Sequence, residues 1–93
     1  MNKEELKQTL VEEGFPHIYE WHDEPGVTYE PHAHTGAVAM YILDGGLTFQ
    51  FDDSSVVLTA GERFDVPVGK EHTAVVGTSG CTFLVGEMIE GDS

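Results

Sequence analysis

The chain has 93 residues, of which 17 are acidic and 4 are basic, and its formal net charge at pH 7 is −13. This length accommodates one domain and excludes a second, and the hydrophobic content of 40% supports a folded core rather than a disordered chain. The acidic balance makes nucleic acids and anionic membrane surfaces poor partners, because both require a basic surface on the protein.

Cysteine usage and the N-terminal composition bear on the compartment. The single cysteine, Cys81, cannot form a disulfide within the chain and is interpreted as a small buried hydrophobic residue. The first residues lack the apolar stretch of a signal peptide, and no apolar run approaches the length of about 20 residues that spans a membrane. A cytoplasmic location without membrane contact is therefore expected.

Residues 1–14 are predicted to form a short N-terminal helix. Asn2 with Glu5 three residues later resembles a capping box, and Gly14 is typical of a helix end. The apolar stripe of this segment comprises Leu6, Leu10 and Val11. Because the stripe is narrow, the helix is expected to pack on the rest of the domain rather than to be stable alone.

Residues 15–93 are predicted to form a single all-β domain. After Pro16 the pattern alternates between two faces, with Tyr19 and Trp21 on the same face. Short runs rich in Val, Ile, Phe and Tyr follow, separated by turn signals. These predicted turns lie at 44–46, 52–54, 60–62, 67–69 and 77–80. Many short strands at this spacing indicate a β-barrel or β-sandwich.

Three histidines are the strongest candidates for chemistry. His32 and His34 are two residues apart, and in an extended strand such side chains leave the same face. His72, in a separate segment, can complete a cluster of three imidazoles, which is a typical site for a divalent metal. His17 and His22 lack such a pattern and are interpreted as surface residues.

The segment around the histidine pair resembles the first motif of the cupin superfamily. That motif consists of a glycine, five residues, His-x-His, three or four residues, a glutamate, six residues and a glycine. The matching residues are Gly26, His32, His34 and either Gly45 or Gly46. The glutamate position falls on Val38, or on Ala39 with the longer spacing, so the motif carboxylate is missing.

A later segment of the chain resembles the second cupin motif, with the matching residues at the spacings that the motif requires. Its matching residues are Gly61, Pro67, Gly69 and His72, with Val76 in place of the final asparagine. The resemblance covers Gly26 to Val76 and implies a jelly-roll β-barrel, often dimeric, whose motif histidines hold a divalent metal inside the barrel. It does not select a reaction, because the superfamily includes dioxygenases, isomerases, decarboxylases, epimerases, sensors and storage proteins.

The missing glutamate has a consequence for the metal and its ligand. Three neutral imidazoles leave a dication uncompensated, so an anionic or bidentate ligand is expected in the open positions. Cupins that resemble this three-histidine arrangement include thiol dioxygenases and β-diketone-cleaving dioxygenases, which use ferrous iron. Iron is therefore the favoured metal, and zinc, nickel, copper and manganese are the alternatives.

Strand alternation also predicts which residues line the pocket. The predicted lining residues are Glu30, Val38, Met40, Ile42 and Val76. This lining is mainly apolar, and no catalytic residue is assigned. Glu30 or Glu87 could replace the missing carboxylate, although a solvated charge at the rim is the favoured interpretation of both. Tyr29, Tyr41 and Trp21 are interpreted as core or interface residues.

The favoured functional hypothesis is a metal-dependent, dioxygenase-like enzyme that acts on a small organic acid, thiol or diketone at the three-histidine site. The alternative is a non-catalytic module that binds a small molecule or a metal, for instance as a sensor. A third hypothesis is a barrel kept for dimerisation, in which the metal only stabilises the fold. A homodimer is expected, because a small barrel has exposed sheet edges and a spare amphipathic helix.

Overall fold

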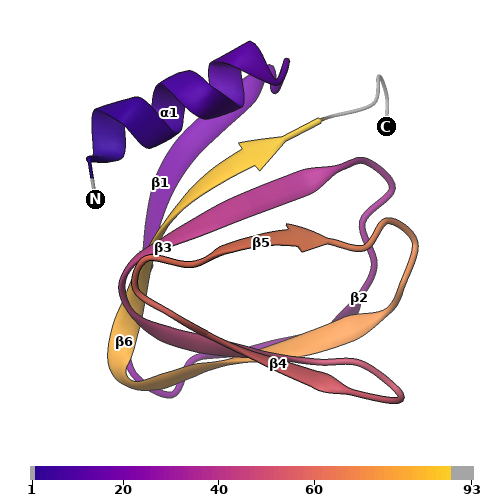
Figure 1. Cartoon of the computed structure of the whole chain (residues 1–93). Coiled ribbons are helices and arrows are strands. Elements are labelled where there is room, and N and C mark those ends of the chain that lie inside the picture. The colour runs from indigo at the N-terminus through magenta and orange to yellow at the C-terminus, as the bar shows by residue number, and fades with distance from the viewer. Residues whose placement is uncertain (1, 89–93) are drawn as a thin grey trace.

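A computed structural model describes residues 2–88 of the chain (Figure 1). Its elements are α1 (Lys3–Glu12), β1 (His17–Asp23), β2 (Thr28–His32), β3 (Val38–Gln50), β4 (Ser55–Thr59), β5 (Arg63–Val66) and β6 (His72–Glu87). The predicted all-β domain extends to residue 93, and its last residues, 89–93, lie outside the described part of the chain. Within that part, no helix has the length and apolar character needed to cross a membrane.

Two long antiparallel strands, β3 and β6, hold the sheet together. The half of β6 that ends at Glu87 pairs with β1 and with the first half of β3, which also pairs with β5; these strands form the first layer. The half of β6 that begins at His72 pairs with β2 and with the second half of β3, which also pairs with β4; these strands form the second layer. The two layers converge where β3 and β6 bend and separate toward the other end (Figure 1). The predicted jelly-roll type of all-β fold is therefore confirmed, as a barrel-like sheet whose outer edges are not joined by strand pairing within residues 2–88.

Glycines allow the two long strands to bend. The turns predicted at 44–46 and 77–80 are wrong, because both segments lie inside continuous strands. Gly45 and Gly80 have positive φ angles of 78° and 76°, and a Cβ placed on Gly45 would overlap the backbone carbonyl oxygen of Gly80. The pairing of β3 with β6 shifts register twice in this region. Glycines that signal turns in the sequence therefore act here as β-bulges, which increase the bend and twist of a strand.

The predicted N-terminal helix is present as α1. The Oδ1 atom of Asn2 accepts hydrogen bonds from the backbone N–H groups of Glu4 (2.9 Å) and Glu5 (3.3 Å). The helix ends at Glu12, and Gly14 follows with a φ of 94°, a left-handed conformation that glycine adopts without strain. In Figure 1, α1 lies along the outer side of the first layer.

Leu10 anchors α1 to the sheet. Its side chain is 0% exposed and packs with Ala39 of β3 and Leu84 of β6. Gly86 of β6 gives this side chain space, because a Cβ on Gly86 would lie 3.2 Å from Leu10 Cδ2. The outer face of the first layer is thus covered by the helix, as the narrow apolar stripe predicted.

Leu10→Ala is expected to lower the free energy of unfolding by about 2–4 kcal/mol, because it removes a fully buried side chain and leaves a cavity. Val11→Ala is the matched control: Val11 is 54% exposed. Its replacement is expected to change the free energy of unfolding by no more than about 0.5 kcal/mol. Urea unfolding followed by circular dichroism measures both. Equal losses in the two variants would show that α1 is not anchored through Leu10.

Candidate metal centre

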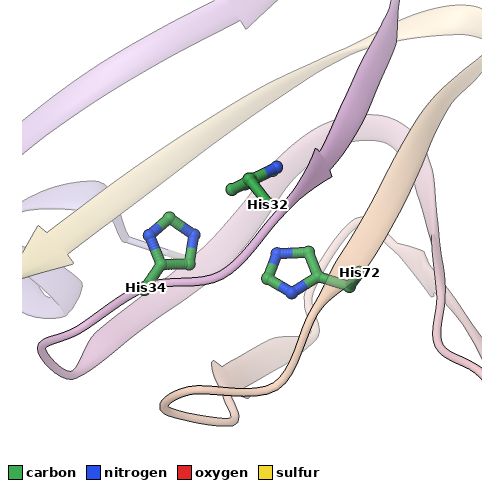
Figure 2. Close-up of side chains that lie close together, drawn as sticks. All are labelled: His32, His34 and His72. Carbon is green, nitrogen blue, oxygen red and sulfur yellow. The ribbon is translucent and has the colours of Figure 1, made fainter.

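Strand pairing brings the three predicted histidines together. His32 ends β2, and its Cα partner in the antiparallel pairing with β6 is His72, the first residue of that strand. His34 follows two residues after β2. The ring centroids lie 4.6 Å apart for His32 and His72, 5.0 Å apart for His32 and His34, and 5.4 Å apart for His34 and His72 (Figure 2). One nitrogen from each ring can be chosen so that all three lie within 4.8 Å of one another.

Backbone carbonyl groups orient two of the imidazoles. His32 Nδ1 lies 2.8 Å from the carbonyl oxygen of Glu30, and His72 Nδ1 lies 2.9 Å from that of Lys70. Because a carbonyl oxygen can only accept, each Nδ1 carries the proton of a neutral ring, and the lone pair is on Nε2. Histidine ligands of protein metal sites are oriented in this way by a hydrogen bond from the other ring nitrogen.

The Nε2 atom of His72 is the strongest sign that the cluster is suited to a metal. His72 is 2% exposed, and its Nε2 has no hydrogen-bond partner among the described residues. A buried polar atom without a partner is costly, and native proteins rarely contain one without a reason. The rings of Phe49 and Phe51, at centroid distances of 5.4 Å and 5.5 Å, pack against the imidazole. The donor set of three neutral imidazoles fits a divalent transition metal.

His34 is only partly buried, and its pKa is lowered from the usual value. Burial of the ring is the main cause, followed by the neighbouring charges that His32 and His72 acquire when protonated. The carboxylate of Glu87 opposes this shift. The lowered pKa favours the neutral ring, which is the form that binds a metal.

A cavity of about 390 Å³ lies next to the cluster, between the two layers. His32 and His34 line it, whereas His72 is not among its lining residues. Most of the wall is apolar and includes Val38, Met40, Leu47, Phe49, Phe83 and Val85. A cavity of this size is at the lower end of the range for sites that bind small molecules.

Of the five residues predicted to line a pocket, two line this cavity and three do not. Val38 and Met40 line the cavity. Ile42 and Val76 are buried in the core but are not lining residues, because they lie next to the bends where the two layers converge. Glu30 is exposed on β2. A bulge in the pairing of β2 with β6, between Tyr29 and His32, reverses the expected alternation and turns Tyr29 rather than Glu30 toward the cavity.

Three further aromatic residues and one carboxylate also line the cavity. Trp21 and Tyr29, for which the sequence favours a core or interface position, both line the cavity. Tyr19, which the sequence assigns only to a strand face, lines it as well. Glu87 also lines it, and Tyr19 Oη donates a hydrogen bond of 2.7 Å to Glu87 Oε2. Glu87 does not belong to the histidine cluster, so the structure does not place it as a fourth ligand. The alternation of Tyr19 and Trp21 along one strand was the available signal for this wall.

Asp23 anchors the other two aromatic side chains. It is 9% exposed, and it accepts hydrogen bonds from Trp21 Nε1 at Oδ1 (2.9 Å) and from Tyr29 Oη at Oδ2. Burial, together with the hydrogen bond to Asp23, raises the pKa of Tyr29 to about 12. Burial and the Glu87 carboxylate raise the pKa of Tyr19 as well. Both phenols therefore stay protonated and donate hydrogen bonds at neutral pH.

The remaining candidates lie outside the site. His22 is exposed, and its Nδ1 lies 2.8 Å from Thr82 Oγ1, while His17 is also exposed, as predicted for both. Cys81 is buried, and its pKa is raised to about 11. Burial is the main cause, and the negative charges of Asp23 and Asp44 contribute less. A neutral, buried thiol that does not line the cavity has no evident chemical role.

Known proteins that are similar to the chain are cupins or share their fold. A RmlC-like cupin from Shewanella frigidimarina is 28% identical with a TM-score of 0.65, and the match covers 81% of this chain and 68% of that one. The polyketide cyclase RemF from Streptomyces resistomycificus is 27% identical with a TM-score of 0.65, and the match covers 75% of this chain and 52% of that one. A protein of unknown function from Rhizobium leguminosarum is 21% identical with a TM-score of 0.69, over 75% of this chain and 66% of that one, and this likeness concerns the fold alone.

The matched region thus spans between 52% and 68% of the length of these structures. No curated protein sequence matches the chain. The sequence model of the cupin domain matches residues 19–85, which is well over half of the chain and includes the three histidines, most of the sheet and most of the cavity wall. The chain therefore belongs to the cupin domain family.

Proposed function

We propose that this cupin binds a divalent metal through His32, His34 and His72 and acts as a metal-dependent enzyme on a small organic molecule held in the adjacent cavity. The observation that carries the proposal is the buried Nε2 of His72, which has no partner within residues 2–88 and lies beside two further imidazoles. The carbonyl groups of Glu30 and Lys70 already set the ring orientations that such binding requires.

Iron is the proposed metal, and the reaction class is oxidation with dioxygen. A bound metal would supply a redox centre or a Lewis acid at the three imidazoles. The set contains no carboxylate, because Val38, or Ala39 with the longer spacing, occupies the position at which a cupin glutamate would stand. Zinc, nickel, copper and manganese also suit three imidazoles, so metal identity belongs to the proposal.

The residues of the cavity wall have separate roles in this proposal. His32 and His34 face the cavity and can present a bound metal to a ligand there. Apolar side chains such as Met40 and Phe83 exclude water from the ligand, which strengthens polar interactions inside the cavity. Glu87, with its hydrogen bond from Tyr19, is the carboxylate of the lining that can accept a proton or a hydrogen bond.

The alternative function is a non-catalytic module that binds a metal or a small molecule. The apolar wall favours it, because only one carboxylate accompanies the histidines among the lining residues. The similar cyclase from Streptomyces resistomycificus is named for polyketides, which favours carbonyl compounds among the candidate ligands of either function.

Oxygen uptake separates the two functions. Protein loaded anaerobically with Fe(II) is expected to consume dioxygen when one member of a panel of small thiols and β-diketones is added, as measured with an oxygen electrode. His32→Ala is expected to lower the rate at least about 100-fold, because removing a ligand should cost more than the 10- to 100-fold typical of a supporting partner. His22→Ala is the control, because His22 is exposed and outside the cluster.

Stoichiometric iron binding without oxygen uptake across the panel would favour the non-catalytic module. Failure of the wild-type protein to bind any of the five metals would contradict the enzyme and the metal-binding form of the module.

A further inference from the structure

Glu87 is the single carboxylate among the described residues that line the cavity. The same lining contains no lysine or arginine. Glu87 is half-buried, so its carboxylate has lost part of its hydration and gains from a hydrogen bond or a cation. The position of Glu87 on β6 and the hydrogen bond from Tyr19 determine which partner the carboxylate can take.

The sheet holds Glu87 in a defined orientation. Phe83, Val85 and Glu87 alternate along β6 and all line the cavity. The Cα partners of Glu87 are His17 on β1 and Val38 on β3, so its backbone lies between two neighbouring strands. The carboxylate therefore projects from a central strand rather than from a mobile loop.

Tyr19 occupies one oxygen of this carboxylate. Its hydroxyl donates to Oε2 at 2.7 Å, and Oε1 accepts no hydrogen bond from any residue between 2 and 88. Asp23 provides the contrast, because both of its oxygens accept hydrogen bonds, from Trp21 and from Tyr29. Asp23 is thus a satisfied structural carboxylate, whereas Glu87, among the residues that the structure describes, has one oxygen that can still accept a hydrogen bond.

We infer that Glu87 is a recognition site for an ammonium group, so that the cavity takes small primary amines that carry a metal-binding group at their other end. This inference rests on the proposed function for the metal-binding end of the ligand, but the ammonium site itself depends only on Glu87 and Tyr19.

The charge of the cavity supports a cation rather than an anion. The chain carries a net charge of −13, and the described lining contains no lysine or arginine that could pair with an anionic group. An ammonium group donates a charge-assisted hydrogen bond to a carboxylate, which is roughly twice as strong as a hydrogen bond between neutral groups. A hydroxyl group at the same place would gain less, and a methyl group would leave Oε1 without a partner.

The first test uses metal-free protein, so that its result does not depend on a metal. Trp21 is the single tryptophan and lines the cavity, so its fluorescence reports on a ligand there. Propylammonium and 1-propanol have the same number of heavy atoms and differ in the terminal group. At matched ionic strength, propylammonium is expected to bind at least about tenfold more tightly. Equal affinity for the two probes would overturn the inference.

Variants test whether the preference for propylammonium over 1-propanol depends on Glu87. Glu87→Gln keeps the shape of the side chain and is expected to abolish the preference for propylammonium, and Tyr19→Phe is expected to reduce it. Glu71→Gln is the matched control, because it removes one negative charge at an exposed position outside the cavity lining. An equal loss in Glu71→Gln and Glu87→Gln would assign the preference to the overall charge of the chain and would contradict a specific site.

The second test uses ligands that carry a metal-binding thiol at one end and a variable group at the other. Cobalt-loaded protein is titrated with cysteamine, 2-mercaptoethanol and 1-propanethiol, which share a thiol and differ only in a terminal ammonium, hydroxyl or methyl group. The sulfur-to-cobalt absorption is expected to saturate at the lowest concentration for cysteamine, and Glu87→Gln is expected to remove that order. Cobalt binding without any preference among the thiols would overturn the ammonium site and leave the metal site intact. A preference for propylammonium in protein that does not bind cobalt would retain the ammonium site and contradict the proposed metal function.

Discussion

His72→Ala is expected to lower the affinity for a divalent metal by at least about 100-fold, because removal of a direct ligand should cost more than loss of a supporting partner. The wild-type protein is expected to bind one metal ion per chain, and the variant is expected to retain almost none after desalting. Elemental analysis of the purified proteins measures the difference. Because a ligand that binds only the folded protein stabilises it, added metal should also raise the thermal midpoint of the wild-type protein but not of the variant.

The buried position of His72 makes a second variant necessary. His72 is 2% exposed, so its replacement can disturb the fold, whereas His34 is only partly buried and its replacement should disturb the fold less. His34→Ala is expected to lose metal to a similar degree while its circular dichroism spectrum stays unchanged. His22→Ala should keep the metal content of the wild-type protein. Equal metal content in the wild-type protein, His34→Ala and His72→Ala would exclude the three-histidine centre.

Gly45→Ala is expected to lower the free energy of unfolding by at least about 4 kcal/mol, a large share of the 5–15 kcal/mol of a typical domain. Two effects combine at this position. The φ of 78° is left-handed, which costs a residue with a Cβ about 1–2 kcal/mol. The added Cβ would also overlap the backbone carbonyl oxygen of Gly80, and a backbone atom cannot move aside as a flexible side chain does.

Gly26→Ala separates the two effects. Gly26 has a similar φ of 81°, but no atom lies within 4 Å of the position of its added Cβ. Its replacement is therefore expected to cost only the conformational penalty of about 1–2 kcal/mol. Chemical unfolding of the two variants gives the comparison. A loss in Gly45→Ala no greater than that in Gly26→Ala would show that the close approach of β3 to β6 at the bend does not limit the fold.

Much of the architecture could be read from local patterns. The helix was identified from Asn2 and Gly14, which satisfy its two ends, and the all-β domain from alternation and frequent glycines. The predicted turns at 44–46 and 77–80 failed because a left-handed glycine is compatible with both a turn and a bulge. Which of the two forms depends on the strand that lies opposite, and Gly45 and Gly80 act on each other across the pairing of β3 with β6.

The cavity shows the same limit of local reasoning. Val38 and Met40, which alternation assigns to the pocket, line the cavity and precede the first bulge of β3. Glu30 does not line it, because the bulge between Tyr29 and His32 adds a residue to one strand and reverses the side-chain faces beyond it. Glu87 had been interpreted as a solvated rim charge, since nothing near it in the sequence indicates that Tyr19, 68 residues away, donates a hydrogen bond to it.

The sequence by itself determined the fold family and the three histidines, because motif spacing and strand periodicity are local properties of the chain. It also determined that the motif carboxylate is missing, at Val38 or at Ala39. Only the tertiary structure decided that His72 Nε2 is buried without a partner within residues 2–88, and that Glu87 lines the same cavity as His32 and His34. Burial and cross-strand contacts depend on register, which is set by bulges and by the packing of distant strands rather than by neighbours in the sequence.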